Sequence, residues 1–255
     1  MDKRAALFAL LDAGPQTYVP AAFFMHFDPS CHVGQAAVDK HLEFFRATGM
    51  DFVKVQYEAV MPPIPSIQRP ADWRQMPSYG LDFYAGQLAC VHGLVQACKA
   101  EALVLVTLYS PFMAAGHTAG DATITAHLQQ DPEAVRPGLE AITASTLRFV
   151  RECVRLGVDG FYASTQGGEA RRLAPGVFRD YVRPYDLVVM REIDAACAFN
   201  ILHVCDYHGP YDDLTSVLDY PGHVVNLPNW LAERPLTPEA GTALFGRPYM
   251  GGLDR

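Results

Sequence analysis

The sequence predicts a TIM (β/α)8 barrel, and three features support this α/β fold class. Segments of strand character alternate with segments of helical character along the 255 residues. The strand segments are almost continuously apolar, as in a parallel sheet whose two faces are both buried. Polar or titratable side chains stand at the end of nearly every strand, and barrels of this type build their active sites at the carboxyl ends of the strands. We therefore expect a single barrel domain over residues 1–255.

Seven strands are predicted, each from a short run of apolar, β-branched or aromatic residues. They lie at residues 19–27, 51–58, 102–110, 158–165, 199–205, 223–228 and 249–254. A closed barrel needs an eighth strand, so we expect that the native protein continues past Arg255 or that this barrel lacks its last β/α unit. An open doubly wound sheet is the alternative, but no glycine-rich phosphate-binding motif follows the first strand.

Helices are predicted where apolar residues recur at helical spacing between capping residues. They lie at residues 1–11, 36–48, 88–100, 124–130, 132–156, 175–198, 212–218 and 238–244. The first is a leading helix within residues 1–18. Residues 61–77 and 111–120 are predicted as loops. The former is rich in proline and too long for a simple connection, so we expect it to cover another part of the molecule.

The composition argues against several classes of partner. The formal net charge is −8 at pH 7, which disfavours nucleic acid and anionic membrane surfaces. No apolar run approaches the roughly 20 residues that span a bilayer. The six cysteines are scattered without a Cys-x-x-Cys pair, which is typical of reduced thiols. We therefore expect a cytoplasmic protein that acts on a small molecule.

The fifth predicted strand carries the most suggestive pair of side chains. His203 and Cys205 are two residues apart, so they point to the same side of an extended strand. An imidazole and a thiolate are ligands that zinc prefers. Two ligands do not make a metal site, and the spacing alone equally fits a histidine and a buried cysteine that share a face by chance.

Other side chains able to act chemically stand at or near the ends of the predicted strands. Those at strand ends are His26, Glu58, Tyr109, Ser164, His203, Cys205, Asn226 and Asp254. Because parallel strands end at one mouth of a barrel, we expect them to line a common site. Tyr57 precedes Glu58, His117 follows the third strand, and Gln166 follows the fourth. A carboxylate at a buried strand end favours a functional role, because burying an unpaired charge is costly.

Simpler roles remain open for several of these residues. His26 and His117 also fit solvated loop histidines. Ser164 and Gln166 also fit caps of the turn at Gly167 and Gly168. Tyr57 and Tyr109 suit the wall of a site better than its chemistry.

Residues 173–185, Leu-Ala-Pro-Gly-Val-Phe-Arg-Asp-Tyr-Val-Arg-Pro-Tyr, resemble a helix start of the uroporphyrinogen decarboxylase superfamily, whose members are TIM barrels. That family segment has the pattern Ser-Pro-x-x-Phe-x-x-Tyr/Phe-x-x-Pro-Tyr and follows the fourth strand. Residues 249–254, Tyr-Met-Gly-Gly-Leu-Asp, are similar to the seventh-strand segment of the family. The resemblance runs from about residue 19 to the end and lacks the last quarter of the family domain.

The decarboxylases of this superfamily carry an arginine-rich loop after the first strand, suited to a substrate with many carboxylates. The matching stretch here is Phe24-Met-His-Phe-Asp28, and no arginine lies between Arg4 and Arg46. This difference argues against uroporphyrinogen as the substrate. By resemblance, the catalytic aspartate of the decarboxylases falls on Glu58, their active-site tyrosine near His117, and their serine on Ser164.

The methyltransferase branch uses zinc to activate a thiol, which takes a methyl group from a corrinoid protein. Its His-x-Cys motif on the fifth strand matches His203 and Cys205. Its more distant cysteine would lie beyond Arg255, so the resemblance implies an incomplete ligand set. Glu58 or His26 could supply another ligand from the same mouth.

The resemblance therefore implies a zinc-dependent methyltransferase-like enzyme with a corrinoid (cobalamin) methyl carrier and a possible corrinoid protein partner. The expected metal ligands are His203 and Cys205; the expected catalytic residues are Glu58, His117 and Ser164; the expected substrate-binding residues are His26, Tyr57, Tyr109, Gln166 and Asn226. A metal-free decarboxylase of a porphyrinogen-like or other carboxylate substrate, as in tetrapyrrole biosynthesis, is the first alternative. A non-catalytic ligand-binding barrel is the second, and a homodimer is possible in each case.

Overall fold

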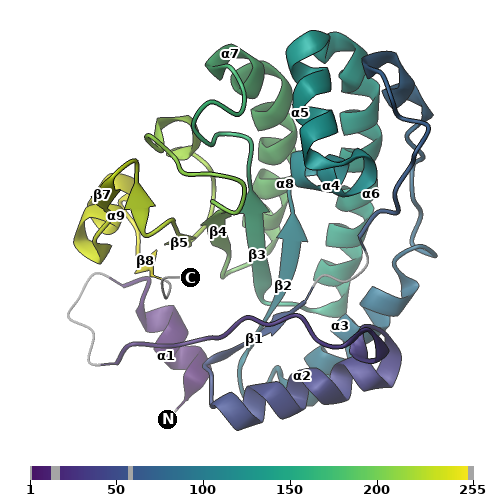
Figure 1. The fold of residues 1–255 in the computed structure, drawn as a ribbon. Coiled ribbons are helices and arrows are strands. Elements are labelled where there is room, and N and C mark those ends of the chain that lie inside the picture. Colours follow the sequence, from purple (N-terminus) through teal and green to yellow (C-terminus); the bar gives the residue numbers. More distant parts are fainter. Residues whose placement is uncertain (1, 13–17, 57–59, 252–255) are drawn as a thin grey trace.

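The computed structural model describes residues 2–12, 18–56 and 60–251 (Figure 1). Among these residues, a sheet of parallel strands has the spatial order β1, β2, β3, β4, β5, β8. The strands are Phe52–Val55, Leu103–Tyr109, Gly160–Thr165, Ile201–Val204, Val224–Asn226 and Tyr249–Met250. Neighbours in the sheet therefore follow one another along the chain, whereas a doubly wound sheet reverses its order. The sheet curls into a half-barrel, which confirms the predicted fold class of an incomplete barrel.

Helices pack around this sheet, most of them on its outer face (Figure 1). They are α1 (Lys3–Ala9), α2 (Gly34–Thr48), α3 (Ala85–Cys98), α4 (Pro111–Ala119), α5 (Asp121–Gln130), α6 (Pro132–Leu156), α7 (Pro175–Val177), α8 (Arg183–Ala196) and α9 (Pro238–Phe245). None of the described helices combines the length and the apolar character needed to cross a membrane.

Shorter elements complete the described chain. They are the 3-10 turns η1 (Pro29–Cys31), η2 (Pro70–Gln75) and η4 (Thr215–Val217), the π-helical turn η3 (Phe178–Val182) that joins α7 to α8, and the hairpin of β6 (Trp230–Leu231) with β7 (Arg234–Pro235). The predicted helix at residues 212–218 is thus reduced to the turn η4. The predicted strand at residues 249–254 is seen as β8, and its last residues lie outside the described part.

The predicted first strand, residues 19–27, is wrong. These residues belong to an irregular segment, which is hydrogen-bonded through Ala21 to the residue just before β1. The Asp51 N–H donates to the Ala21 carbonyl over 2.8 Å, and the Ala21 N–H donates to the Asp51 carboxylate over 2.7 Å. Pro20 has no N–H to give to a ladder, so aromatic composition did not suffice here to form a strand.

The loop predicted at residues 111–120 is also wrong, because this segment forms α4. Pro111 occupies the first helical position, and the Ser110 hydroxyl accepts the Met113 N–H over 3.4 Å as an N-cap. The helix ends at Gly120, whose φ of 93° favours glycine. Ser-Pro at the start and Gly at the end are the usual boundaries of a helix, so the sequence did carry this signal.

The proline-rich segment, residues 61–77, covers α5 and α6 rather than the mouth of the half-barrel. Its Trp73 is fully buried, and the indole N–H donates to His127 of α5 over 3.0 Å. A Cβ placed on Gly138 of α6 would come within 2.6 Å of the indole, so glycine is needed there for this close approach.

The two faces of the sheet differ because side chains alternate along each strand. Outward-facing residues of the strands, such as Val53 and Val106, pack in the main core with the helices. Inward-facing residues near the amino ends form a second cluster, here called the apolar floor: Phe52, Leu103, Leu105, Ile201 and Val224. Helix α1 closes the floor with Leu7, and its Arg4 binds Asp159 through two hydrogen bonds of 2.7 and 2.9 Å.

Candidate active site

Four of the residues predicted for the site stand side by side across four strands. The strand register pairs Tyr109 with Ser164, Ser164 with His203, and His203 with Asn226. Each lies an even number of residues beyond a floor residue or a floor-facing position on its strand, so all four belong to the inner face. We call them the mouth row. The structure therefore brings these predicted residues to one edge of the sheet.

Tyr162 lies two residues before Ser164 on β3 and contacts two residues of the mouth row. Its ring lies 5.0 Å from the His203 ring, with the two planes 30° apart. Its hydroxyl donates to the Asn226 side-chain oxygen, and the Asn226 amide donates to the Met250 carbonyl over 2.8 Å. Contacts from two neighbouring strands thus restrict the orientation of Asn226 and His203.

Cys205 follows β4 directly, and Gln166 follows β3. The Gln166 side-chain N–H donates to the Cys205 sulfur over 3.2 Å, and the thiol is almost fully buried. The Gln166 carbonyl in turn accepts from Arg172 over 3.3 Å, which fixes the direction of the amide.

Sequence reasoning missed a cluster of charged side chains above Cys205. Arg172 contacts Glu169 at 2.5 Å and Asp121 at 2.9 Å, and its guanidinium lies over the Phe112 ring at 4.7 Å. Asp121 also faces His208 at 3.2 Å. The start of α5 and the loops that follow β3 and β4 are therefore tied together by these contacts. Glu169 and Arg172 are three residues apart after a double glycine, which was the available signal, but Asp121 lies 51 residues away.

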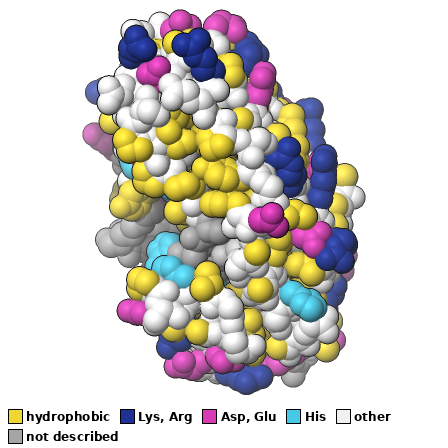
Figure 2. Space-filling view, turned by 90° about the vertical axis from the view of Figure 1, so that its right-hand side faces the viewer, with side chains coloured by type: hydrophobic (Ala, Val, Ile, Leu, Met, Phe, Trp, Pro, Cys, Tyr) yellow, Lys and Arg dark blue, Asp and Glu magenta, His cyan; other side chains and the backbone are white. Residues whose placement is uncertain are grey.

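The predicted histidines outside the strands lie at the edge of this region. The ring of His117, on α4, is 5.0 Å from that of Tyr109, and burial lowers the pKa of His117. His26 is exposed and packs edge-on against Phe24 at 5.0 Å. Figure 2 shows histidine side chains beside a central hollow, with hydrophobic side chains across the middle of that face and charged ones mostly above and below.

Three predicted residues lie outside the described part of the chain: Tyr57, Glu58 and Asp254. Within the described ranges, no group of three or more His, Cys, Asp or Glu side chains is arranged to hold a metal ion. His203 lies on the inner face of the fifth predicted strand, now β4, and Cys205 is the first residue after that strand. The described residues thus offer two donors of the right chemistry, whereas a catalytic zinc ion usually has three protein ligands.

Sequence reasoning also did not predict a buried carboxyl group that lies behind the mouth row. Asp186 of α8 is fully buried and accepts hydrogen bonds from Thr165 at 2.7 Å and from Tyr220 at 3.1 Å. Burial raises the pKa of Asp186 to about 7, although these hydroxyls partly offset the effect. The group fastens α8 to the end of β3, where the site is built.

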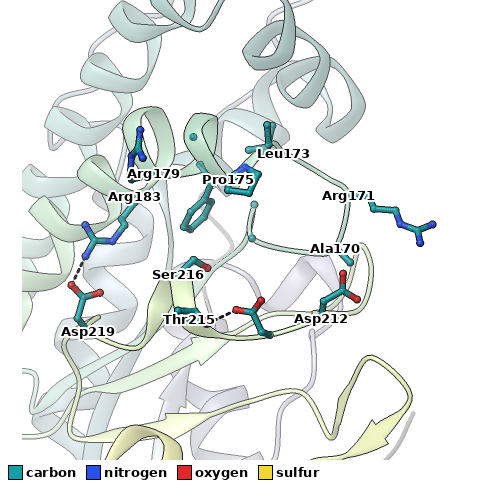
Figure 3. Close-up of a pocket in the computed structure, with 16 residues that line it drawn as sticks. Ala170, Arg171, Leu173, Pro175, Arg179, Arg183, Asp212, Thr215, Ser216 and Asp219 are labelled. Atoms are coloured by element: carbon teal, nitrogen blue, oxygen red, sulfur yellow. Dashed lines mark hydrogen bonds and ion pairs between the residues drawn. The ribbon is translucent and has the colours of Figure 1, made fainter.

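A cavity of about 960 Å³ lies beside the mouth row and not within it. It opens between the loop after β3 and residues 212–219, below the start of the helix that begins with α7 (Figure 3). Phe178 and Pro175 form its apolar wall, and Arg183 pairs with Asp219 at one end. None of the residues predicted for the site lines it.

A half-barrel of parallel strands with polar side chains at their carboxyl ends is the architecture of barrel enzymes. The family model described as uroporphyrinogen decarboxylase (URO-D) matches residues 42–227, so the chain belongs to this family. This confirms the family predicted from the sequence.

One solved structure similar to this chain is a methyltransferase from Methanosarcina mazei. The TM-score is 0.75, with 13% identity over 96% of this chain and 80% of that chain. At this identity the similarity concerns the fold. No protein with a curated description matches the chain.

Proposed function

We propose that this chain is a methyltransferase-type enzyme of the URO-D family that moves a methyl group between a corrinoid and a thiol. In this proposal His203 and Cys205 bind zinc. The observation that carries it is the placement of His203 on the inner face at the carboxyl end of β4, between Ser164 and Asn226 of the mouth row, with Cys205 directly after the strand. Barrel enzymes place their reacting groups at this position.

The surrounding residues support a ligand role for the pair. A metal-binding histidine and cysteine need neighbours that fix their orientation. Tyr162 contacts the His203 ring, and Gln166, itself held by Arg172, donates to the Cys205 sulfur. Bound zinc would lower the pKa of a thiol substrate and so make it a nucleophile near neutral pH.

The proposal requires at least one further ligand in addition to His203 and Cys205. Glu58 is the candidate that the sequence offers, because it stands three residues after Val55, the last residue of β1. Carboxylate oxygens are common zinc ligands beside imidazole and thiolate. Glu58→Gln should weaken zinc binding while leaving the imidazole and the thiol in place.

Metal analysis of the purified protein tests this function. We expect about one zinc ion per chain in the wild type, a loss of at least tenfold in zinc affinity for Cys205→Ala and His203→Ala, and unchanged zinc content for Cys90→Ala. Cys90 is a matched control because it is equally buried but faces away, in α3. Demethylation of methylcobalamin by 2-mercaptoethanol, followed by absorbance, then checks the reaction. A folded wild type that binds no zinc would overturn the proposal and favour the decarboxylase.

A further inference from the structure

The two oxygens of the buried Asp186 carboxyl group have different surroundings. Its Oδ2 accepts hydrogen bonds from the hydroxyls of Thr165 and Tyr220. Its Oδ1 is equally buried but has no hydrogen-bond partner among the described residues. Buried polar atoms are nearly always hydrogen-bonded, so an oxygen without a partner calls for an explanation.

No cation in the described part of the chain pairs with Asp186. The polar groups that face it from the neighbouring elements are hydroxyls, namely those of Thr165 at the end of β3, Ser110 before α4, and Tyr211 and Tyr220 after β4. Arg183, three residues earlier on α8, is paired with Asp219. A buried carboxylate without a cation is costly, and burial accordingly raises the pKa of Asp186 to about 7. Below this pH the carboxyl group is therefore held in its neutral form.

A small cavity, of about 10 Å³, adjoins Asp186. Tyr109 and Ser164 of the mouth row line it from the sheet, and Val189 and Met190 line it from α8. A cavity of this size is about large enough for one water molecule. Because two hydroxyl groups donate to Oδ2, the proton of the neutral carboxyl group belongs on Oδ1, which is the oxygen that still needs a partner.

We propose that Asp186 binds one water molecule in this cavity, with the Oδ1 hydroxyl of its neutral carboxyl group as the hydrogen-bond donor. Ser110, which also lines the cavity, offers the water a second polar partner. The water lies against Tyr109 and Ser164, so it connects the buried acid to the back of the mouth row. The inference goes beyond the proposed function and depends on neither zinc nor methyl transfer.

A crystal structure that resolves ordered water tests the position of this site. We expect one water molecule within about 3 Å of Asp186 Oδ1 in the wild type. Asp186→Asn should keep this water, because an amide has one donor and one acceptor group, as a neutral carboxyl group has. Val189→Ile should displace the water by filling the cavity. Val188→Ile is the matched control, because Val188 is exposed on the same helix, and it should leave the water in place.

Infrared spectroscopy tests the proton. The carbonyl stretching band of a protonated carboxyl group should be present in the wild type at pH 5, decrease at least tenfold by pH 9, and be absent from Asp186→Asn. Val189→Ile should move this band to higher wavenumber, because the carboxyl group loses its hydrogen bond to water, whereas Val188→Ile should not move it.

Three results would overturn the inference. They are a wild-type structure without water at Asp186 Oδ1, a wild type without the protonated carboxyl band at pH 5, and a Val189→Ile variant whose band is unchanged. If Val189→Ile fails to fold, the wild-type structure and the comparison of the wild-type band with that of Asp186→Asn still decide the matter.

Discussion

The two ends of the half-barrel use the same strands for different purposes. At the amino ends, the inward-facing side chains form the apolar floor, and the buried Asp159 is paired with Arg4 of α1. At the carboxyl ends, the inward-facing side chains are those of the mouth row, Tyr109, Ser164, His203 and Asn226. On β2, for example, the inner face changes from Leu105 of the apolar floor to Tyr109 of the mouth row within four residues. The floor therefore provides stability, whereas the mouth keeps buried polar groups that a stable core would avoid.

The buried polar groups at the mouth are accompanied by a network of charged side chains. Arg172 has a side chain that is 9% exposed, and that of Glu169 is 1% exposed. Pairs buried to this degree are costly to break, because the remaining partner is left as an uncompensated charge. Exposed pairs on the helices, such as Arg155 with Glu152, carry no such cost. The difference between buried and exposed ion pairs can be tested by substitution.

Breaking the charge network at the mouth should produce the largest loss of stability. Arg172→Met leaves Glu169 buried without its partner and should lower the free energy of unfolding by about 3–5 kcal/mol. Urea denaturation measures this change. Arg155→Met is the matched control on the surface and should leave the free energy of unfolding nearly unchanged. The double variant Arg172→Met/Glu169→Gln should recover part of the loss, and no recovery would contradict a charge effect.

Removing volume from the floor should have the next largest effect. Leu105 is fully buried in the floor cluster, so Leu105→Ala should cost about 2–5 kcal/mol through lost apolar contact and a remaining cavity. On the same strand, Tyr109→Phe at the mouth should change the free energy of unfolding by less than about 1 kcal/mol. Chemical denaturation of both variants checks the contrast. Equal losses at the two positions would argue against a division of roles along β2.

Much of the fold could be predicted because apolar runs and helix boundaries are local signals. The predicted helix at residues 132–156 has the same bounds as α6, and each strand of the main sheet falls on a predicted one. The errors have local causes too. Helix α4 was not predicted because its small residues show no clear helical periodicity. A strand was wrongly predicted at residues 19–27 from their aromatic composition, although this segment forms no strand ladder.

The candidate site was predictable where it depends on strand ends alone. Tyr109, Ser164, His203 and Asn226 lie together because parallel strands end at one edge. The contact of Arg172 with Asp121 joins the loop after β3 to the start of α5, and no spacing in the sequence indicates it.

Asp186 gives the smallest and most specific contrast, because its effect depends on pH. Burial raises its pKa to about 7, against an unfolded value near 3.8. Between these values the folded chain holds a proton that the unfolded chain has lost, so stability should fall as the pH rises from about 4 to about 7. Asp186→Asn keeps an acceptor for Thr165 but cannot ionise. The variant should therefore gain about 2–4 kcal/mol over the wild type at pH 8 and much less at pH 5, measured by urea denaturation. An equal difference at both pH values would show that Asp186 is not protonated in the folded protein at pH 5, and α8 would then be fastened to β3 by a carboxylate ion.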